Sequence, residues 1–311
     1  MSLGRIIKGV GGIYTVLDLN TKEYVTVGCR GKLRNMVVDK DSSFNKQITH
    51  KTKLETKTIK ISPKVGDYVE YEDNLITEIK PRVNDLIRPS IANVDQVLLL
   101  FAAKKPDFQL NLLDQFLVLM EKENVKVNII ITKIDLLTIE ELDELKETMK
   151  YYEKIGYKVF FVNSKAKEGF EEIKVIFRDK ISVLSGQTGA GKSTFINSMI
   201  PGFNLHTQEI SEALGRGKHT TTATELYEFE GGFIGDTPGF SKLDFSIMEA
   251  SDIKEYFVEF GQYQCKFRGC LHDKEPGCEI KNAVISGQVL KERYENYLKF
   301  LNTIRQTVKK Y

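Results

Sequence analysis

The stretch that decides the fold of this chain reads Gly186-Gln187-Thr188-Gly189-Ala190-Gly191-Lys192-Ser193-Thr194. It fits the pattern G-x-x-x-x-G-K-[ST], in which glycines let the backbone curl so that successive N–H groups point at phosphate oxygens. The apolar residues 181–184 before it predict a short buried strand, and residues 193–200 after it predict a helix. A strand, a glycine-rich loop and the positive end of a helix dipole together predict a phosphate-binding loop.

Two side chains of this loop carry the expected chemistry. Lys192 would reach the β- and γ-phosphates of a nucleoside triphosphate, and the Ser193 hydroxyl would ligate Mg²⁺. The alternative is a glycine-rich turn that matches the pattern by accident, but such a turn needs no strand before it and no helix after it. We therefore expect residues 186–194 to hold a nucleotide.

Upstream of this loop, buried apolar segments alternate with amphipathic ones. Strands are predicted at 94–102, 125–131 and 158–162, and helices at 110–124, 139–155 and 171–178. This alternation predicts an α/β fold with a doubly wound, mostly parallel sheet. Because ligands of such sheets bind at the carboxyl ends of the strands, motifs at the strand ends should converge on one crevice.

Two of these strands end in motifs that suit guanine. Thr132-Lys133-Ile134-Asp135 resembles the [NT]-K-x-D element of GTPases, with Thr132 where many of them carry asparagine, so that one amide contact is lost. Asp135 would accept hydrogen bonds from the N1–H and amino groups of guanine, donors that adenine lacks at that edge, and the Lys133 stem would pack over the base. Asn163-Ser164-Lys165 loosely resembles the S-A-K loop whose backbone contacts the guanine O6 atom. Either motif alone could be an ordinary strand end, but beside a phosphate loop they predict GTP and GDP as ligands.

Downstream lie two segments of the kind that senses a γ-phosphate. In Gly215-Arg216-Gly217-Lys218-His219-Thr220-Thr221-Thr222, Thr221 is expected to ligate Mg²⁺. In Asp236-Thr237-Pro238-Gly239, Asp236 would hold a water on Mg²⁺ and the Gly239 N–H would contact the γ-phosphate. Lys192, Thr221 and Asp236 are therefore predicted to be catalytic.

The order of the motifs is unusual. In Ras-like GTPases the phosphate loop comes first and the guanine motifs last, whereas here the guanine motifs precede the phosphate loop. A site built from strand ends does not depend on chain order, so the pattern predicts a circularly permuted GTPase domain.

The rest of the chain indicates two further parts. With 311 residues, 41% of them hydrophobic, the chain is long enough for two or three domains. About five short strands with glycine turns in the first eighty residues predict a small β-barrel, of either the OB or the SH3-like kind.

Residues 30–60 carry nine Lys or Arg and three acids, so the segment 34–60 is either a solvated loop or an RNA contact. The net charge of +2, the lack of a signal pattern and the lack of a long apolar run predict a soluble cytoplasmic protein.

The C-terminal region contains a metal-binding pattern. Cys265-x4-Cys270-x-His272-x5-Cys278 offers three thiolates and an imidazole, which suit one tetrahedral zinc ion in a structural role. The alternative is a group of buried reduced cysteines with a stray histidine. Helices are predicted at 247–260 and 286–311, the latter with an apolar face and an exposed cationic side that comprises Lys291, Arg293, Lys299, Arg305, Lys309 and Lys310.

Taken together, these motifs closely resemble the circularly permuted bacterial GTPase family called ribosome small-subunit-dependent GTPase A, and the resemblance covers essentially the whole length. It implies an N-terminal OB-fold (1–80), a permuted GTPase domain (81–245) and a helical zinc domain (246–311). It also implies a role in late maturation of the small (30S) ribosomal subunit, with GTP hydrolysis stimulated by that subunit and contacts to its 16S rRNA from the OB-fold and the zinc domain. A monomer without membrane contact is expected.

One departure from Ras-like GTPases shapes the expected mechanism. Phe240 stands where those enzymes place the glutamine that orients the attacking water, and a phenyl ring cannot polarise water. Low intrinsic turnover is therefore expected, and we hypothesise that His219 supplies this function when the ribosome orders its loop. The alternative is that His219 is simply a polar loop residue.

Two other classes of function remain open from the sequence. The first is a nucleotide-gated RNA-binding module in which hydrolysis only resets binding, so that blocking hydrolysis merely delays release. The second is a P-loop kinase or ATPase, which Asp135 and the Asp236 motif disfavour.

Overall fold

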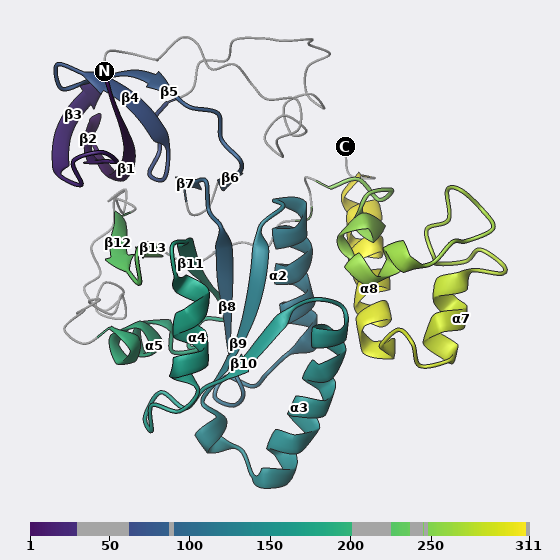
Figure 1. Ribbon diagram of the computed structural model, residues 1–311. Coiled ribbons are helices and arrows are strands. Elements are labelled where there is room, and N and C mark those ends of the chain that lie inside the picture. Colours follow the sequence, from purple (N-terminus) through teal and green to yellow (C-terminus); the bar gives the residue numbers. More distant parts are fainter. Residues whose placement is uncertain (30–61, 87–89, 201–224, 237–244, 246–247, 309–311) are drawn as a thin grey trace, which may run out of the picture.

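The computed structural model describes residues 1–29, 62–86, 90–200, 225–236, 245 and 248–308. Figure 1 shows an N-terminal β-barrel, a central sheet with helices on both faces, and a helical C-terminal part that packs beside helix α2 (Leu110–Lys122). Within the described residues, no helix is both long and apolar enough to cross a membrane.

The barrel consists of β1 (Ser2–Val10), β2 (Ile13–Asp18), β3 (Tyr24–Cys29), β4 (Tyr68–Glu72) and β5 (Leu75–Ile79). The strands follow the order β1-β2-β3-β5-β4, with β3 and β5 parallel, and β4 pairs back with β1 to close the barrel. Alternate side chains fill the interior, among them the fully buried Ile6, Val16 and Val69. The strand order makes the barrel OB-like, which decides between the two kinds that the sequence left open. The basic segment 34–60 lies outside the described residues.

The central sheet confirms the predicted alternation of strands and helices. Its parallel strands follow the order β10 (Lys158–Phe161), β9 (Lys126–Thr132), β8 (Gln96–Ala102), β11 (Ile181–Gly186) and β13 (Gly232–Asp236), and β12 (Glu225–Phe229) pairs antiparallel with β13. Because side chains alternate along a strand, Leu99 and Phe101 of β8 pack on the side of α2 and α3 (Ile139–Lys154). Leu98 and Leu100 pack on the side of α4 (Phe170–Phe177) and α5 (Lys192–Met199). Helices thus cover both faces, as expected of a doubly wound sheet.

A buried ion pair joins the barrel to the segment that follows it, and strand pairing joins the barrel to the central sheet. Arg82, which follows the barrel, donates from Nε and Nη2 to the two carboxylate oxygens of Asp67 at 2.7 Å each, and both side chains are almost completely buried. The short strands β6 (Asp85–Leu86) and β7 (Ile91–Ala92) follow and lead into β8. Farther along, β1 pairs with β12 at Lys8 and Glu225, whose side chains form an ion pair of 2.8 Å. One continuous sheet therefore runs through both parts.

The C-terminal part differs from the prediction in its first segment. Instead of a helix over 247–260, the described residues form two 3₁₀ turns, η2 (Ile253–Tyr256) and η3 (Val258–Gln262). Phe257 between them has φ −96° and ψ 88°, angles that interrupt a helix and place its ring in the core against Tyr297 and Phe300. The helices α7 (Glu279–Ile285) and α8 (Lys291–Val308) complete this part, and Val118 of α2 belongs to the same core.

The sequence prediction for Arg293 was wrong. This residue was expected on the exposed cationic side of the last helix, but its side chain is fully buried between α8, α2 and η3. Arg293 donates from Nη1 to Asp114 of α2 at 2.6 Å and from Nε to Glu259 of η3 at 2.6 Å. Burial opposes its positive charge, but Asp114 and Glu259 outweigh this effect and raise the pKa of the guanidinium. Asp114 also accepts hydrogen bonds from Tyr152 of α3 and Asn296 of α8 at 2.8 and 2.7 Å, so polar contacts join the two domains.

This buried cluster gives a stability prediction. Replacing the cation by Arg293→Met leaves two carboxylates buried without a counter-charge, and we expect a loss of about 3–5 kcal/mol in the free energy of unfolding of the C-terminal part. Urea denaturation followed by circular dichroism measures the change. Lys299→Met on the exposed side of the same helix is the control and should change this free energy by less than about 0.5 kcal/mol. Equal midpoints for the two variants would contradict the assignment of Arg293 as an essential buried charge.

Candidate functional site: a nucleotide-binding crevice and a Cys3His cluster

The phosphate loop begins where β11 ends, and its shape requires glycine. Gly186 has φ +123°, and a Cβ atom there would lie 2.1 Å from the Leu100 carbonyl oxygen of the neighbouring strand. The loop is held at this point by a hydrogen bond of 3.0 Å from the Gln187 N–H to the same oxygen. Thr188 and Gly189 form an exposed crest, and α5 starts at Lys192, so the backbone offers the arrangement that binds phosphate at a helix N-terminus.

The ammonium group of Lys192 places a positive charge at the phosphate loop. Its Nζ atom donates to the carbonyl oxygens of Gln187 at 3.0 Å and Gly186 at 3.4 Å, which folds the side chain back over the loop. Desolvation by burial lowers the pKa of Lys192. An anion placed on the loop would offset this cost, so the residue fits a phosphate ligand. Ser193 follows in the first turn of α5 and is half-buried.

The Thr132–Asp135 element bonds directly to the phosphate loop. The Thr132 hydroxyl donates to the Ala190 carbonyl oxygen at 2.6 Å, and Lys133 Nζ donates to the Gly189 carbonyl oxygen at 2.8 Å. Thr132 therefore contacts the phosphate loop through its side chain. The sequence alone predicts only the loss of an amide contact, because threonine replaces asparagine here. Asp135 lies in the 3₁₀ turn η1 (Ile134–Leu136) that follows β9, with its carboxylate accessible at the carboxyl edge of the sheet.

The third predicted segment, Asn163–Lys165, follows β10 and contacts both Asp135 and α5. The Asn163 Oδ1 atom accepts hydrogen bonds from the backbone N–H groups of Lys165 and Ala166 at 3.1 and 3.2 Å, which shapes a tight turn after β10. The Ser198 hydroxyl of α5 donates to the Ser164 carbonyl oxygen at 3.3 Å, so the turn rests on the helix that carries Lys192. Lys165 Nζ lies 3.1 Å from Asp135 Oδ2. The structure thus brings together the three segments 132–135, 163–165 and 186–194.

One side chain in this region was not recognised from the sequence as a structural contact. Gln187 is buried, accepts a hydrogen bond of 3.3 Å from the Ala102 N–H and donates one of 3.0 Å to the Asp107 carbonyl oxygen. It therefore ties the phosphate loop to the segment between β8 and α2. The motif G-x-x-x-x-G-K-[ST] accepts any residue at position 187. Only the ability of the glutamine amide to donate and accept hydrogen bonds could have indicated this contact from the sequence.

The switch residues can be placed only in part. Asp236 is the last residue of β13, the strand beside β11, so its backbone lies near the phosphate loop. His219, Thr221, Gly239 and Phe240 lie outside the described residues.

The four predicted metal ligands converge in the C-terminal part. The thiol sulfurs of Cys265, Cys270 and Cys278 and a ring nitrogen of His272 all lie within 4.8 Å of one another. A tetrahedral zinc ion with Zn–S bonds of about 2.3 Å places two sulfurs about 3.8 Å apart and a sulfur and a nitrogen about 3.6 Å apart. The Cys265 and Cys278 sulfurs are 3.8 Å apart, and His272 Nδ1 lies 3.5 and 3.4 Å from them. The donor set and its spacing therefore fit zinc.

Contacts from other segments of the C-terminal part support the four residues. Burial raises the pKa of the Cys270 thiol to about 12, which favours the neutral thiol wherever no cation is bound. The backbone around the ligands is held by Tyr294, whose hydroxyl donates to the His272 carbonyl oxygen at 2.6 Å, and by Lys254, whose Nζ donates to the Cys270 carbonyl oxygen at 3.0 Å. All four positions are occupied by protein atoms, which indicates a structural rather than a catalytic metal site.

Two features together define the class of protein. Residues 132–135 and the phosphate loop meet at the carboxyl edge of a doubly wound sheet, and the first precedes the second along the chain. This combination is that of a circularly permuted P-loop GTPase.

The comparisons with known proteins identify the family. The family model described as RsgA GTPase matches residues 79–246. Curated relatives include the small ribosomal subunit biogenesis GTPase RsgA 2 of Oceanobacillus iheyensis, 43% identical with 100% of both chains covered, and the small ribosomal subunit biogenesis GTPase RsgA of Bacillus subtilis, 40% identical with the same coverage. The chain belongs to the RsgA GTPase family.

Solved structures support the same assignment. YjeQ from Thermotoga maritima superposes with a TM-score of 0.80 at 32% identity, covering 97% of this chain and 98% of that one. YloQ, described as a circularly permuted GTPase, superposes with a TM-score of 0.77 at 36% identity, covering 98% and 96%. The similarity therefore extends beyond the GTPase domain to the barrel and the C-terminal part.

The cysteine cluster yields a prediction on metal content. The purified chain should contain about one zinc ion, and Cys270→Ala should lose it because three ligands hold a structural zinc ion poorly. Elemental analysis by mass spectrometry measures the stoichiometry. Cys29→Ala, in the barrel, is the control and should keep full zinc content. Equal zinc in the two variants would show that the cluster is not the metal site.

Proposed function

We propose that this chain is a Mg²⁺-dependent GTP hydrolase that acts in the late assembly of the small ribosomal subunit. The observation that carries the proposal is the pair of hydrogen bonds from Thr132 and Lys133 to the phosphate loop, because they hold a base-recognition segment and a phosphate cradle as one site. The names of the relatives, which are small ribosomal subunit biogenesis GTPases, supply the cellular process.

The nucleotide would lie across the three segments that meet in the crevice. Asp135 would accept hydrogen bonds from the guanine ring, the Lys133 stem would cover the base, and the turn at Asn163 and Ser164 would meet O6 through its backbone. The phosphates would lie on the backbone N–H groups of residues 186–194 and on Lys192. A carboxylate that needs two donors disfavours adenine, because binding adenine would leave it without partners.

Hydrolysis requires positioning and charge stabilisation rather than covalent chemistry. Lys192 would stabilise charge on the β- and γ-phosphates, and the Gly239 N–H would contact the γ-phosphate. A bound Mg²⁺ ion would neutralise charge between these phosphates, with Ser193, Thr221 and Asp236 as the residues that would hold it. His219 would orient the attacking water in place of the glutamine of Ras-like enzymes, whose position Phe240 occupies.

The partner in this proposal is the small subunit itself. The OB-like barrel belongs to a fold that binds oligonucleotides, and both the barrel and the zinc-binding part would contact 16S rRNA. The protein would act as a monomer in the cytoplasm, where subunits are assembled.

Turnover assays test the proposed function. GTP hydrolysis by the full chain should be slow alone, and purified small subunits should raise it on the order of tenfold or more, because the subunit would order the switch segments. Purified large subunits are the control and should leave the rate near its basal value. Failure of small subunits to stimulate hydrolysis would overturn the ribosomal part of the proposal.

A single substitution tests the role of His219. His219→Ala should lose most of the subunit-stimulated turnover while its affinity for GDP stays unchanged, because the imidazole would act only on the attacking water. Stimulated turnover is measured at saturating GTP, and His219→Gln, which can still orient water, should retain part of the rate. Full stimulated turnover in the alanine variant would refute this role.

A further inference from the structure

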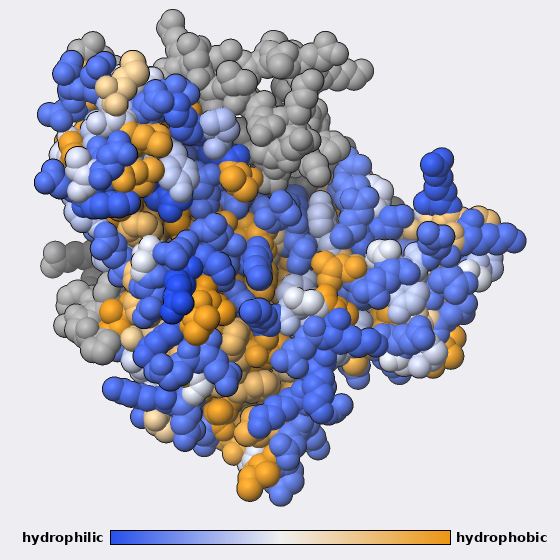
Figure 2. All heavy atoms as spheres, in the orientation of Figure 1, coloured by the Kyte–Doolittle hydropathy of each residue, from blue (hydrophilic) through white to orange (hydrophobic). Residues whose placement is uncertain are grey.

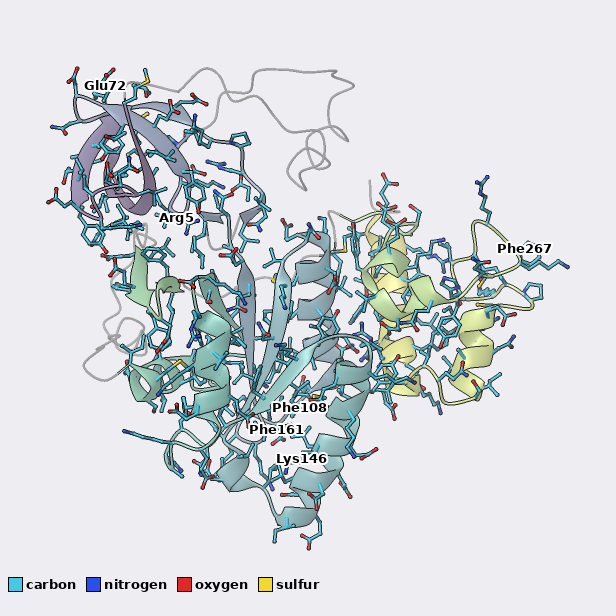
Figure 3. The ribbon with its side chains drawn as sticks, viewed as in Figure 1. Arg5, Glu72, Phe108, Lys146, Phe161 and Phe267 are labelled. Carbon is cyan, nitrogen blue, oxygen red and sulfur yellow. The ribbon has the colours of Figure 1, made fainter. Side chains whose placement is uncertain are left out.

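The segment between the first two zinc-cluster cysteines carries an exposed aromatic ring between two cations. This segment, Lys266-Phe267-Arg268-Gly269, is called the Phe267 loop below, and all four residues are exposed. Phe267 is 46% exposed, whereas Phe257, Phe260 and Phe300 of the same domain are at most 4% exposed. Figure 3 shows Phe267 at the outer edge of the C-terminal part, on the side away from the central sheet.

The loop is held in shape from both ends. Cys265 before it and Cys270 after it belong to the metal-binding cluster, and the Cys270 N–H donates to the Phe267 carbonyl oxygen at 3.1 Å. The Cys270 carbonyl oxygen in turn accepts a hydrogen bond from Lys254. A ring presented on such a fixed turn loses little conformational entropy when it binds a partner.

Cations outnumber acids in residues 265–278, which carry Lys266, Arg268 and Lys274 against Asp273 and Glu275. Asp273 pairs with Arg305 at 2.7 Å, and Glu275 accepts hydrogen bonds of 2.9 Å from the N–H groups of Leu271 and Asp273. Within the described part of the chain, Lys266, Arg268 and Lys274 form no ion pair with a carboxylate. In Figure 2, hydrophilic residues cover much of the face of the C-terminal part that this view shows.

We propose that the Phe267 loop binds single-stranded RNA, with the phenyl ring stacked on an unpaired base and Lys266 and Arg268 on the flanking phosphates. An aromatic face stacks on any base, and cations on both sides follow the backbone of the strand. The inference deepens the proposed function by assigning an RNA contact to a named surface. It rests on the proposed function only for the identification of this RNA as ribosomal RNA.

The test uses the full, zinc-loaded chain and a fluorescein-labelled oligouridine of twelve nucleotides. Phe267→Ala should weaken binding by about 5- to 100-fold with an unchanged salt dependence, because it removes stacking but no charge. Lys266→Ala should lower the slope of log affinity against log salt by about 0.7, because it removes one phosphate contact. Ile285→Ala, which truncates another exposed apolar side chain of the same domain, is the matched control and should bind like the parent chain. Zinc content and basal GTP turnover should be unchanged in all three variants.

A spectroscopic measurement reports the stacking itself. The chain contains no tryptophan, so Phe267→Trp introduces a single one, which should bind the oligonucleotide at least as tightly as the parent and lose fluorescence when a base stacks on it. Unquenched tryptophan, or equal affinities for Phe267→Ala and Ile285→Ala, would overturn the proposal. A loss of affinity for the small subunit without a loss for the oligonucleotide would also overturn it and would indicate a protein contact. Weakened oligonucleotide binding by Phe267→Ala would support it even if small subunits did not stimulate GTP turnover.

Discussion

The structure depends above all on the bonds that join the end of β9 to the phosphate loop. Thr132 and Lys133 donate to the carbonyl oxygens of Ala190 and Gly189, at positions that lie more than fifty residues farther along the chain. Both segments follow strands that pair in register with β8, where Ile130 of β9 and Gly186 of β11 both lie opposite Leu100, so the backbone sets their relative height. The side-chain bonds then join the segment expected to meet a base to the loop expected to hold phosphates.

Helix α2 connects the phosphate loop to the C-terminal part. Lys133 also donates to the Lys105 carbonyl oxygen and Gln187 to that of Asp107, so two hydrogen bonds hold the segment before α2 against the end of β9 and the phosphate loop. Asp114 of α2 then pairs with the buried Arg293 of α8. Buried ion pairs often contribute little net stability, but they penalise any other arrangement strongly because a charge would be left unpaired. The cluster therefore holds the C-terminal part against α2 and α3 of the central α/β part.

Much of this was predictable from the sequence, for physical reasons that can be traced to particular residues. Short motifs such as residues 186–194 and the Cys3His residues have a characteristic local geometry, so the sequence predicted the alternating sheet, the loop at the end of β11 and the convergence of the four metal-ligand candidates. Arg293 was misplaced because its position among polar residues on a helix indicates a solvated face, and only the tertiary partners Asp114 and Glu259 make burial possible. The pairing of β1 with β12 was likewise beyond prediction, because it joins residues more than two hundred positions apart. The 3₁₀ turns around Phe257 replaced a predicted helix because core packing outweighed helical propensity.

The central claim is that Asp135 and the phosphate loop form one guanine-nucleotide site. The most direct measurement compares the dissociation constants of GDP and ADP for the full chain by titration calorimetry. The account predicts that GDP binds more tightly by about 10³-fold or more, because a carboxylate that needs two donors would lose both partners with adenine. Equal affinities for the two nucleotides would contradict it.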